Sequence, residues 1–176
     1  MIKMVEVEER KHEETSEIDI GWMTLAVKVA HQGLENGEVP VGAIFVDPKT
    51  NAELARSHNL TTKTKNATTH CEVNCIREIS AQQKVVEGCT VYVTVEPCIM
   101  CAYALNLAKV ARVVFGAKND KFGGNGSILS LNRFPGNVAA YQVEGGVLAD
   151  EAVKLLQSFY EHGNMKLPED KRQRRS

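Results

Sequence analysis

Apolar side chains recur every three to four residues over positions 19–36, near the start of the chain. This spacing predicts an amphipathic helix, because it places one stripe of side chains on the face that packs against the protein interior. Gly37 is placed to end the helix, and Pro40 prevents it from resuming. The predicted stripe consists of Ile20, Met23, Val27, Ala30 and Leu34.

Two segments of strand character follow this helix. Residues 41–46 are a short run of apolar residues, several of them branched or aromatic, and residues 53–58 are a weaker strand pattern. The residues between them, 47–51, are Asp, Pro, Lys, Thr and Asn, which favour a turn. The pattern predicts an antiparallel hairpin.

A polar loop at residues 59–69 separates the hairpin from a second helical pattern at residues 70–82. Thr68 or Thr69 is expected to cap this helix, because a threonine hydroxyl accepts a hydrogen bond from a free N–H of the first turn. Residues 89–95 then give the strongest strand pattern of the chain.

The remaining pattern alternates between strand and helix. Pro97 suits the first position of a helix that runs to about residue 109, and residues 112–116 predict another strand. A glycine-rich loop at 118–126 precedes a final helix at 150–162, whose apolar side is expected to carry Leu155, Leu156, Phe159 and Tyr160. This alternation favours an α/β fold, with a mixed sheet between layers of helices.

Composition narrows the class of protein. Of the 176 residues, 43% are apolar and 24% are charged, as in a soluble globular domain. No apolar run approaches the roughly 18 residues that a membrane span requires, so no membrane partner is expected. The first 17 residues are acidic and lack an apolar core, which argues against a secretory signal or a transit peptide. We therefore expect a location in the nucleus and/or the cytoplasm.

Charge is distributed unevenly, although the formal net charge is only -1. Residues 1–17 carry three basic and six acidic side chains, residues 18–165 thirteen and fourteen, and residues 166–176 five and two. The resulting charges are -3, -1 and +3. They predict an acidic flexible arm (1–17), one folded domain (18–165) and a basic tail (166–176), so the small total does not exclude a nucleic-acid partner.

The candidate chemistry lies in two short segments. One is His70-Cys71-Glu72, at the start of the second predicted helix, and the other is Pro97-Cys98-Ile99-Met100-Cys101, after the strongest strand. In this order they match the H-x-E and P-C-x-x-C pattern of zinc-dependent nucleobase deaminases. The pattern predicts that residues 18–165 form a zinc-dependent deaminase domain.

The residue types fit a catalytic zinc site. Cys98 and Cys101 are three positions apart, so their thiolates share one side of a helical turn and can bind one ion. His70 would add a neutral third ligand, which leaves the fourth tetrahedral position for water. The N-termini of both helices would direct partial positive charge toward this place.

Glu72 is the candidate general acid and base. It would take a proton from the zinc-activated water and return it to the ring nitrogen and the leaving ammonia. Side chains two positions apart diverge by about 200° within a helix, so His70 and Glu72 can converge only where the helix directs its open end at the metal.

The other cysteines leave alternatives open. Cys71 and Cys75 offer a rival ligand pair, but they would serve equally well as small buried hydrophobes, and Cys89 is expected in the core. A purely structural zinc module would unfold without zinc and would hold no exchangeable water. Five cysteines, an odd number, fit a reducing compartment.

Four stretches resemble the tRNA adenosine deaminases, in particular the catalytic subunit of the eukaryotic wobble-position enzyme. They are residues 38–42 (EVPVG), 64–72 (TKNATTHCE), 92–101 (YVTVEPCIMC) and 122–127 (FGGNGS). The resemblance implies a cytidine deaminase-like, three-layer α/β/α fold with a mixed five-stranded sheet. It also implies conversion of adenosine to inosine at the wobble position of a tRNA anticodon, with the base splayed out of the anticodon stem-loop.

The resemblance assigns roles residue by residue. His70, Cys98 and Cys101 would bind Zn²⁺, and Glu72 would move protons. It implies a heterodimer with a related, inactive subunit that lacks this glutamate, so Glu72 places the chain on the active side. Cys71 departs from the family, which usually has alanine there, and its side chain is expected to point away from the metal. The implied substrate-binding residues are Asn59, Val39, Val41, Glu96 and Pro97.

The tRNA-binding candidates are basic. Lys171, Arg172, Arg174 and Arg175 would contact phosphates or serve as a nuclear import signal, with a solvated tail as the plain alternative. Lys121 is a further candidate, and Lys63, Lys65, Lys118 and Arg133 are expected to flank the pocket loops. Two other functions remain open: a deaminase of free cytidine or other nucleobases and nucleotides, and a non-catalytic zinc subunit that holds tRNA.

Overall fold

The computed structural model describes residues 16–133 and 140–162. Five strands form one sheet in the order β2-β1-β3-β4-β5, in which β1 is antiparallel to both β2 and β3, and β3, β4 and β5 are mutually parallel. The predicted mixed five-stranded sheet is therefore confirmed. The strands are β1 (Gly42–Asp47), β2 (Ala52–His58), β3 (Thr90–Val95), β4 (Arg112–Ala117) and β5 (Gln142–Gly145).

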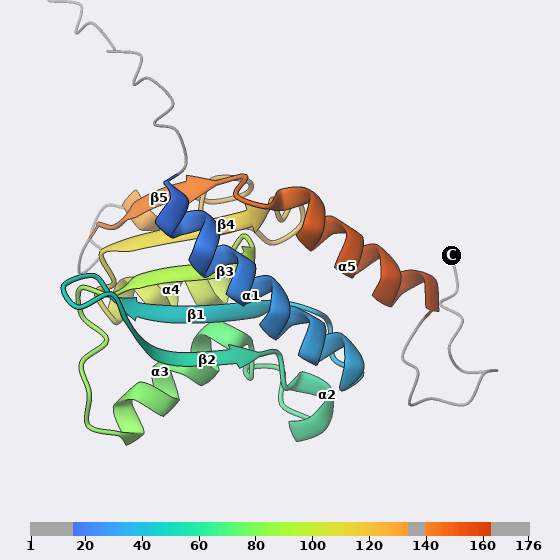
Figure 1. Cartoon of the computed structure of the whole chain (residues 1–176), viewed down its shortest axis with the longest axis horizontal. Helices are drawn as coiled ribbons and strands as arrows, with labels where there is room; N and C mark the ends of the chain where they lie inside the picture. Colours follow the sequence, from blue (N-terminus) through green and yellow to red (C-terminus); the bar gives the residue numbers. More distant parts are fainter. Residues whose placement is uncertain (1–15, 134–139, 163–176) are drawn as a thin grey trace, which may run out of the picture.

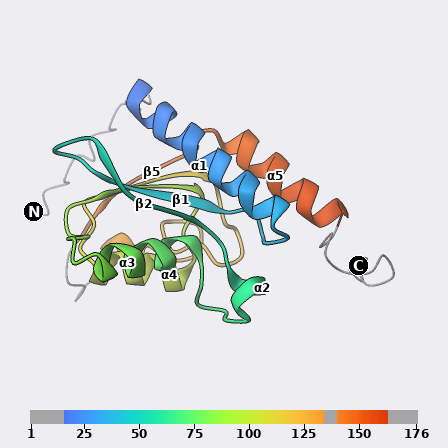
Figure 2. The same cartoon turned by 60° about the horizontal axis from the view of Figure 1, so that its bottom comes forward.

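Helices cover both faces of the sheet. Figures 1 and 2 show α1 and α5 on one face and α3 and α4 on the other, which confirms the three-layer α/β/α arrangement. The helices are α1 (Glu17–Glu35), α2 (Thr61–Thr64), α3 (Cys71–Ala81), α4 (Ile99–Leu107) and α5 (Ala149–His162), with a 3-10 turn η1 (Leu131–Arg133). No helix in the described ranges is long and apolar enough to cross a membrane.

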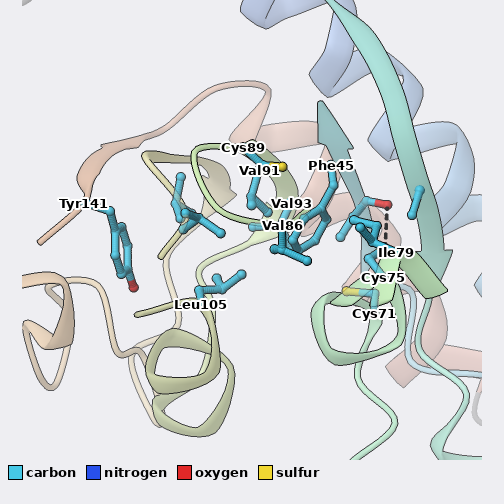
Figure 3. Packing of buried hydrophobic residues seen from close by; sticks show 14 of the residues in the cluster. Phe45, Cys71, Cys75, Ile79, Val86, Cys89, Val91, Val93, Leu105 and Tyr141 are labelled. Atoms are coloured by element: carbon cyan, nitrogen blue, oxygen red, sulfur yellow. Dashed lines mark hydrogen bonds between the residues drawn. The ribbon is translucent and has the colours of Figure 1, made fainter. Parts of the chain in front are cut away.

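Strand residues alternate between two cores because successive side chains point to opposite faces of a sheet. Phe45, Val91 and Val93 point toward α3 and α4, and they form one cluster with Cys75 and Ile79 of α3 (Figure 3). The intervening residues Ile44, Val46, Tyr92 and Val114 pack toward α1. Burial on both faces explains the nearly continuous apolar runs of β1, β3 and β4.

Two short elements fall where the sequence pattern predicts none. β5 is a polar edge strand of only four residues, and it forms by parallel pairing with β4. α2 is a single turn within the predicted polar loop. Neither carries an apolar periodicity, so the sequence pattern does not predict them. Contacts with distant residues hold each of them in place. The predicted hairpin of β1 and β2 is confirmed.

Both helices that carry the zinc motif begin slightly later than predicted. His70 is the N-cap of α3, so the expected cap by Thr68 or Thr69 is wrong. The hydroxyl of Thr69 instead donates to the carbonyl of Asn66. Cys98 is the N-cap of α4, so Pro97 precedes the helix and does not occupy its first position.

The buried face of α1 includes Met23 and Ala30 of the predicted stripe but is rotated from the rest of it. Ile20 is exposed, whereas Asp19, Ala26 and Gly33 face the sheet. Small residues on this face let the helix approach closely: a Cβ at Gly42 of β1 would lie 2.5 Å from the carbonyl oxygen of Ala26. The backbone of α1 therefore approaches that of β1 closely at Gly42, on the helix face that also carries the buried side chain of Met23.

Candidate active site

The N-termini of α3 and α4 meet at one place beside the sheet. Nδ1 of His70 lies 3.6 Å from Sγ of Cys98 and 3.6 Å from Sγ of Cys101. His70 and Cys98 are the N-caps, and Cys101 lies in the first turn of α4. The helix ends thus face the site, as the spacing of His70 and Glu72 requires.

The geometry of these three residues fits zinc. In a tetrahedral site with ordinary Zn–N and Zn–S bond lengths, a nitrogen and a sulfur ligand lie about 3.6 Å apart. Their three candidate ligand atoms fall within 4.8 Å of one another, so within the described ranges these residues form a group that could hold a metal ion. Hydrogen bonds from Cys101 and then His70 outweigh the effect of burial and lower the pKa of the Cys98 thiol to about 4. The thiolate of Cys98, the form that binds zinc, is therefore favoured, whereas the hydrogen bond to Cys98 and then burial raise the pKa of the Cys101 thiol.

Glu72 is buried beside this cluster and is 3% exposed. Burial raises the pKa of its carboxyl group. The Cys71 thiol donates a 3.1 Å hydrogen bond to Oε2 of Glu72. Cys75 lies in the core, where its thiol is 3.9 Å from the carbonyl oxygen of Ala43. Cys71 and Cys75 thus lie outside the group of His70, Cys98 and Cys101, and this geometry favours that group over the rival ligand pair.

A pocket of about 500 Å³ opens over the cluster. Its size is that of a site for a small molecule or a single base. Several residues predicted from sequence line it: Val39, Val41, Asn59, His70, Glu72, Glu96 and Cys98. Pro97 is buried and is not part of this lining.

Asn59 is held in place by two hydrogen bonds. Its Oδ1 accepts from the backbone N–H of Cys71 at 3.0 Å, and its Nδ2 donates to the carbonyl of Val39 at 3.3 Å. The side chain therefore joins the start of α3 to the segment before β1. It lines the pocket with its polar atoms already engaged by backbone groups.

Two buried glutamates beside the pocket accept hydrogen bonds from backbone N–H groups of neighbouring segments. Glu38 accepts from the N–H groups of Thr62 and Lys63, at 2.9 and 2.7 Å, and so anchors α2. Glu96 binds the loop on the other side. Burial raises its pKa, but hydrogen bonds from Ser127 and from loop N–H groups outweigh this effect, so the pKa lies below its usual value.

Other lining residues carry no sequence motif. Leu156 and Tyr160 of α5 reach the pocket, although both were expected to pack on the apolar side of that helix. Tyr160 is 47% exposed. Thr61 of α2 also contributes. Only the placement of α5 and α2 beside the site makes these residues part of it.

The basic candidates lie at several different places. Lys118 and Lys121 line the pocket, while Lys63 lines a neighbouring cavity with Glu38. Lys65 is exposed after α2, and Arg133 lines a separate groove with Arg112. The tail candidates lie outside the described residues: Lys171, Arg172, Arg174 and Arg175.

Residues 16–117 match the family described as the cytidine and deoxycytidylate deaminase zinc-binding region. The chain is 40% identical to tRNA-specific adenosine deaminase 2 of Xenopus tropicalis, over 89% of this chain and 96% of that protein. It is 38% identical to tRNA-specific adenosine deaminase subunit tad2 of Schizosaccharomyces pombe, over 87% of this chain and 40% of that longer protein.

Solved structures of deaminases have a fold similar to that of this chain. One comes from a study of A-to-I editing by tRNA:A34 deaminases at the wobble position, with a TM-score of 0.72 and 33% identity over 77% of this chain and 99% of that chain. The guanine deaminase of Nitrosomonas europaea has a TM-score of 0.65 at 17% identity, over 80% and 83% of the two chains, which supports the fold alone. The chain therefore belongs to the tRNA-specific adenosine deaminases, within the family that shares the zinc-binding region of cytidine and deoxycytidylate deaminases.

Proposed function

We propose that this protein hydrolyses adenosine to inosine at the wobble position of tRNA anticodons and releases ammonia. The observation that carries the proposal is the pocket itself, which places the His70, Cys98 and Cys101 cluster and the buried Glu72 carboxylate at one site. The relatives, which are tRNA-specific adenosine deaminases, support adenosine in tRNA as the substrate.

Zinc is the metal that these ligands would hold. Two sulfurs and one imidazole nitrogen form a preferred donor set for Zn²⁺, and their spacing fits a tetrahedral site. When bound, zinc supplies a water of lowered pKa, so that hydroxide is available near neutral pH.

Glu72 moves the protons. It takes one proton from the attacking water, whose oxygen adds to C6 of adenine, and passes it to the ring nitrogen. It then transfers the remaining hydroxyl proton to the amino group, which leaves as ammonia. The thiol of Cys71 holds Oε2 of the same carboxylate, which restricts the orientation of the group during both transfers.

The pocket requires a base that has left its stack. Val39 and Val41 supply an apolar wall, while Asn59 and Lys121 lie around the same space. An unpaired base in an anticodon loop meets this requirement at a lower cost than a base within a duplex. This physical difference supports a loop adenosine as the substrate.

We also propose that the protein acts as the catalytic subunit of a heterodimer with a related subunit that lacks the proton-shuttling glutamate. An exposed apolar surface supports such a partner. α4 has no charged residue, and the loop beside its first turn adds further apolar side chains. The exposed residues of this surface are Ile99, Met100, Tyr103, Leu107, Phe122, Ile128 and Leu129. A location in the nucleus and/or cytoplasm is part of the same proposal.

One experiment tests the activity. The chain, with and without a deaminase-like partner subunit, is incubated with a tRNA that carries adenosine at the wobble position, and inosine is measured. We expect inosine from the complex and none after Glu72→Ala, with zinc content retained. Unchanged inosine formation in Glu72→Ala would contradict the mechanism.

Two further arms separate the alternatives. Turnover of free cytidine, guanine or nucleotides without tRNA would instead identify a small-molecule deaminase. Tight tRNA binding without inosine formation, in the presence of the partner and zinc, would indicate a non-catalytic subunit.

A further inference from the structure

The carboxylate of Glu96 is enclosed by one loop of the pocket, residues 118–127, which we call the pocket loop. Glu96 is 2% exposed. Its Oε2 accepts from the backbone N–H of Asn119 at 3.0 Å and from the Ser127 hydroxyl. Its Oε1 accepts from the backbone N–H groups of Asn125 and Ser127, each at 3.0 Å. One side chain therefore binds both ends of the pocket loop.

The backbone of the pocket loop passes directly over this carboxylate. A Cβ at Gly123 would lie 2.5 Å from Oε1 of Glu96, so a glycine is needed there for the loop to approach so closely. Gly123 also pairs with Cys98 in an isolated β-bridge, and the N–H of Ile99 donates to the carbonyl of Phe122 at 2.8 Å. The pocket loop is thus joined to the start of α4 as well as to Glu96.

The same loop supplies one wall of the pocket. Five consecutive residues of it line the space over the metal cluster: Lys118, Asn119, Asp120, Lys121 and Phe122. Fixing the loop at Asn119 and Ser127 fixes the position of this wall relative to Cys98. A preformed wall lowers the ordering cost that a substrate would otherwise meet on binding.

We propose that Glu96 is a positioning residue that fixes the pocket loop as a wall of the base pocket, and that it does not itself contact the base. A carboxylate offers about four acceptor positions, and the loop occupies them with hydrogen bonds to both oxygens. Glu96 was predicted from sequence as a substrate-binding residue, and this assignment gives it a different role at the same site. The kinetic test of this role rests on the proposed function, because it measures deamination of tRNA.

The kinetic test compares two variants of the full chain in its complex, Glu96→Gln and Ser127→Ala. The first replaces one acceptor oxygen with an amide N–H₂ that faces loop donors, whereas the second removes a single hydrogen bond. For Glu96→Gln we expect KM for wobble-adenosine tRNA to rise about tenfold, with a smaller rise for Ser127→Ala, while kcat changes little. Glu87→Gln, at an exposed position, is the matched control and should leave KM unchanged.

Hydrogen exchange provides a readout that does not depend on activity. In the wild type the amides of Asn119, Asn125 and Ser127 should exchange slowly, and Glu96→Gln should accelerate them by at least about tenfold while zinc content stays the same. Unchanged exchange in Glu96→Gln would overturn the proposal.

A fall in kcat for Glu96→Gln without a rise in KM would also overturn the proposal, because it would indicate that the carboxylate contacts the reacting base. If the wild-type complex forms no inosine, the proposed function fails. The exchange measurement then still decides whether Glu96 fixes the pocket loop.

Discussion

The backbone N–H of Lys63 donates a 2.7 Å hydrogen bond to Oε1 of Glu38, a carboxylate that is 1% exposed. The N–H of Thr62 donates to Oε2 of the same group. Glu38 therefore satisfies free N–H groups at the start of α2, which otherwise has no side-chain cap. Thr61 of α2 lines the pocket. The hydrogen bonds to the buried Glu38 carboxylate therefore hold in place a turn that forms part of the pocket wall.

We expect Glu38→Gln to destabilise the protein by about 2 kcal/mol, because an amide cannot replace a charged acceptor for two backbone donors. The free energy of unfolding from urea titration measures the change. Glu35→Gln, at the exposed end of α1, is the control and should change stability by less than about 0.5 kcal/mol. Equal stabilities of the two variants would contradict this role for Glu38.

Substitution of single cysteines should separate metal ligands from core residues. Cys101→Ala is expected to lose zinc. Cys71→Ala and Cys75→Ala should retain one zinc per chain, because Cys71 and Cys75 do not belong to the group of His70, Cys98 and Cys101. Metal analysis of the purified proteins measures this directly. Loss of zinc from Cys71→Ala at unchanged fold would show that the thiol beside Glu72 contributes to the site.

The ion pair between Asp19 and Arg112 predicts a pH dependence of stability. The guanidinium of Arg112 donates to both oxygens of Asp19, at 2.7 and 2.9 Å. Burial opposes ionisation of Asp19, but hydrogen bonds from Arg112, Ser16 and Tyr92 outweigh it and lower its pKa from 3.8 to about 2.

A lowered folded-state pKa means that the ionised form is stabilised by folding. This contribution, about 2 kcal/mol, is fully present above about pH 4 and is lost as the pH falls toward 2. Asp19→Asn should therefore be less stable than the wild type at neutral pH, and the difference should shrink between about pH 4 and 2. Chemical unfolding at a series of pH values tests this, and parallel curves for the two proteins would refute it.

Two glycines should respond to alanine in opposite directions. Gly42→Ala is expected to cost about 1–3 kcal/mol, because its Cβ would lie 2.5 Å from backbone atoms of α1 at Ala26 and Ala30. Gly21→Ala, on the exposed side of α1 with no atom near its Cβ, should stabilise by about 0.5–1 kcal/mol. Thermal unfolding of both variants measures the difference. A tolerated Gly42→Ala would contradict the close packing of α1 on β1.

The basic tail is expected to strengthen tRNA binding. Truncation after Leu167 removes four basic side chains, Lys171, Arg172, Arg174 and Arg175, together with two acidic ones. Affinity for tRNA at moderate salt should fall, and the dependence of affinity on salt should become shallower, because fewer counterions are released. Zinc content should not change. Equal affinity of the truncated and full chains would contradict a role of the tail in binding.

The sequence by itself determined the parts of this protein that depend on local patterns. Apolar runs and turn signals predicted β1 to β4, and apolar residues on one side predicted α1 and α5, because side chains of these elements face the core at a fixed period. Start signals at the two motif segments predicted α3 and α4. The spacing of the two motif segments predicted the three candidate ligands that the structure brings together, since each motif lies within about one helical turn.

Tertiary structure alone decided the features that depend on distant partners. The carboxylates of Glu38 and Glu96 bind backbone groups up to 25 and 31 residues away, and no local period encodes such contacts. β5 forms only by pairing with β4, and Tyr160 reaches the pocket only because α5 packs beside it. The sequence therefore determined the candidate residues for the chemistry, and the packing of loops and helices around them decided the shape of the pocket.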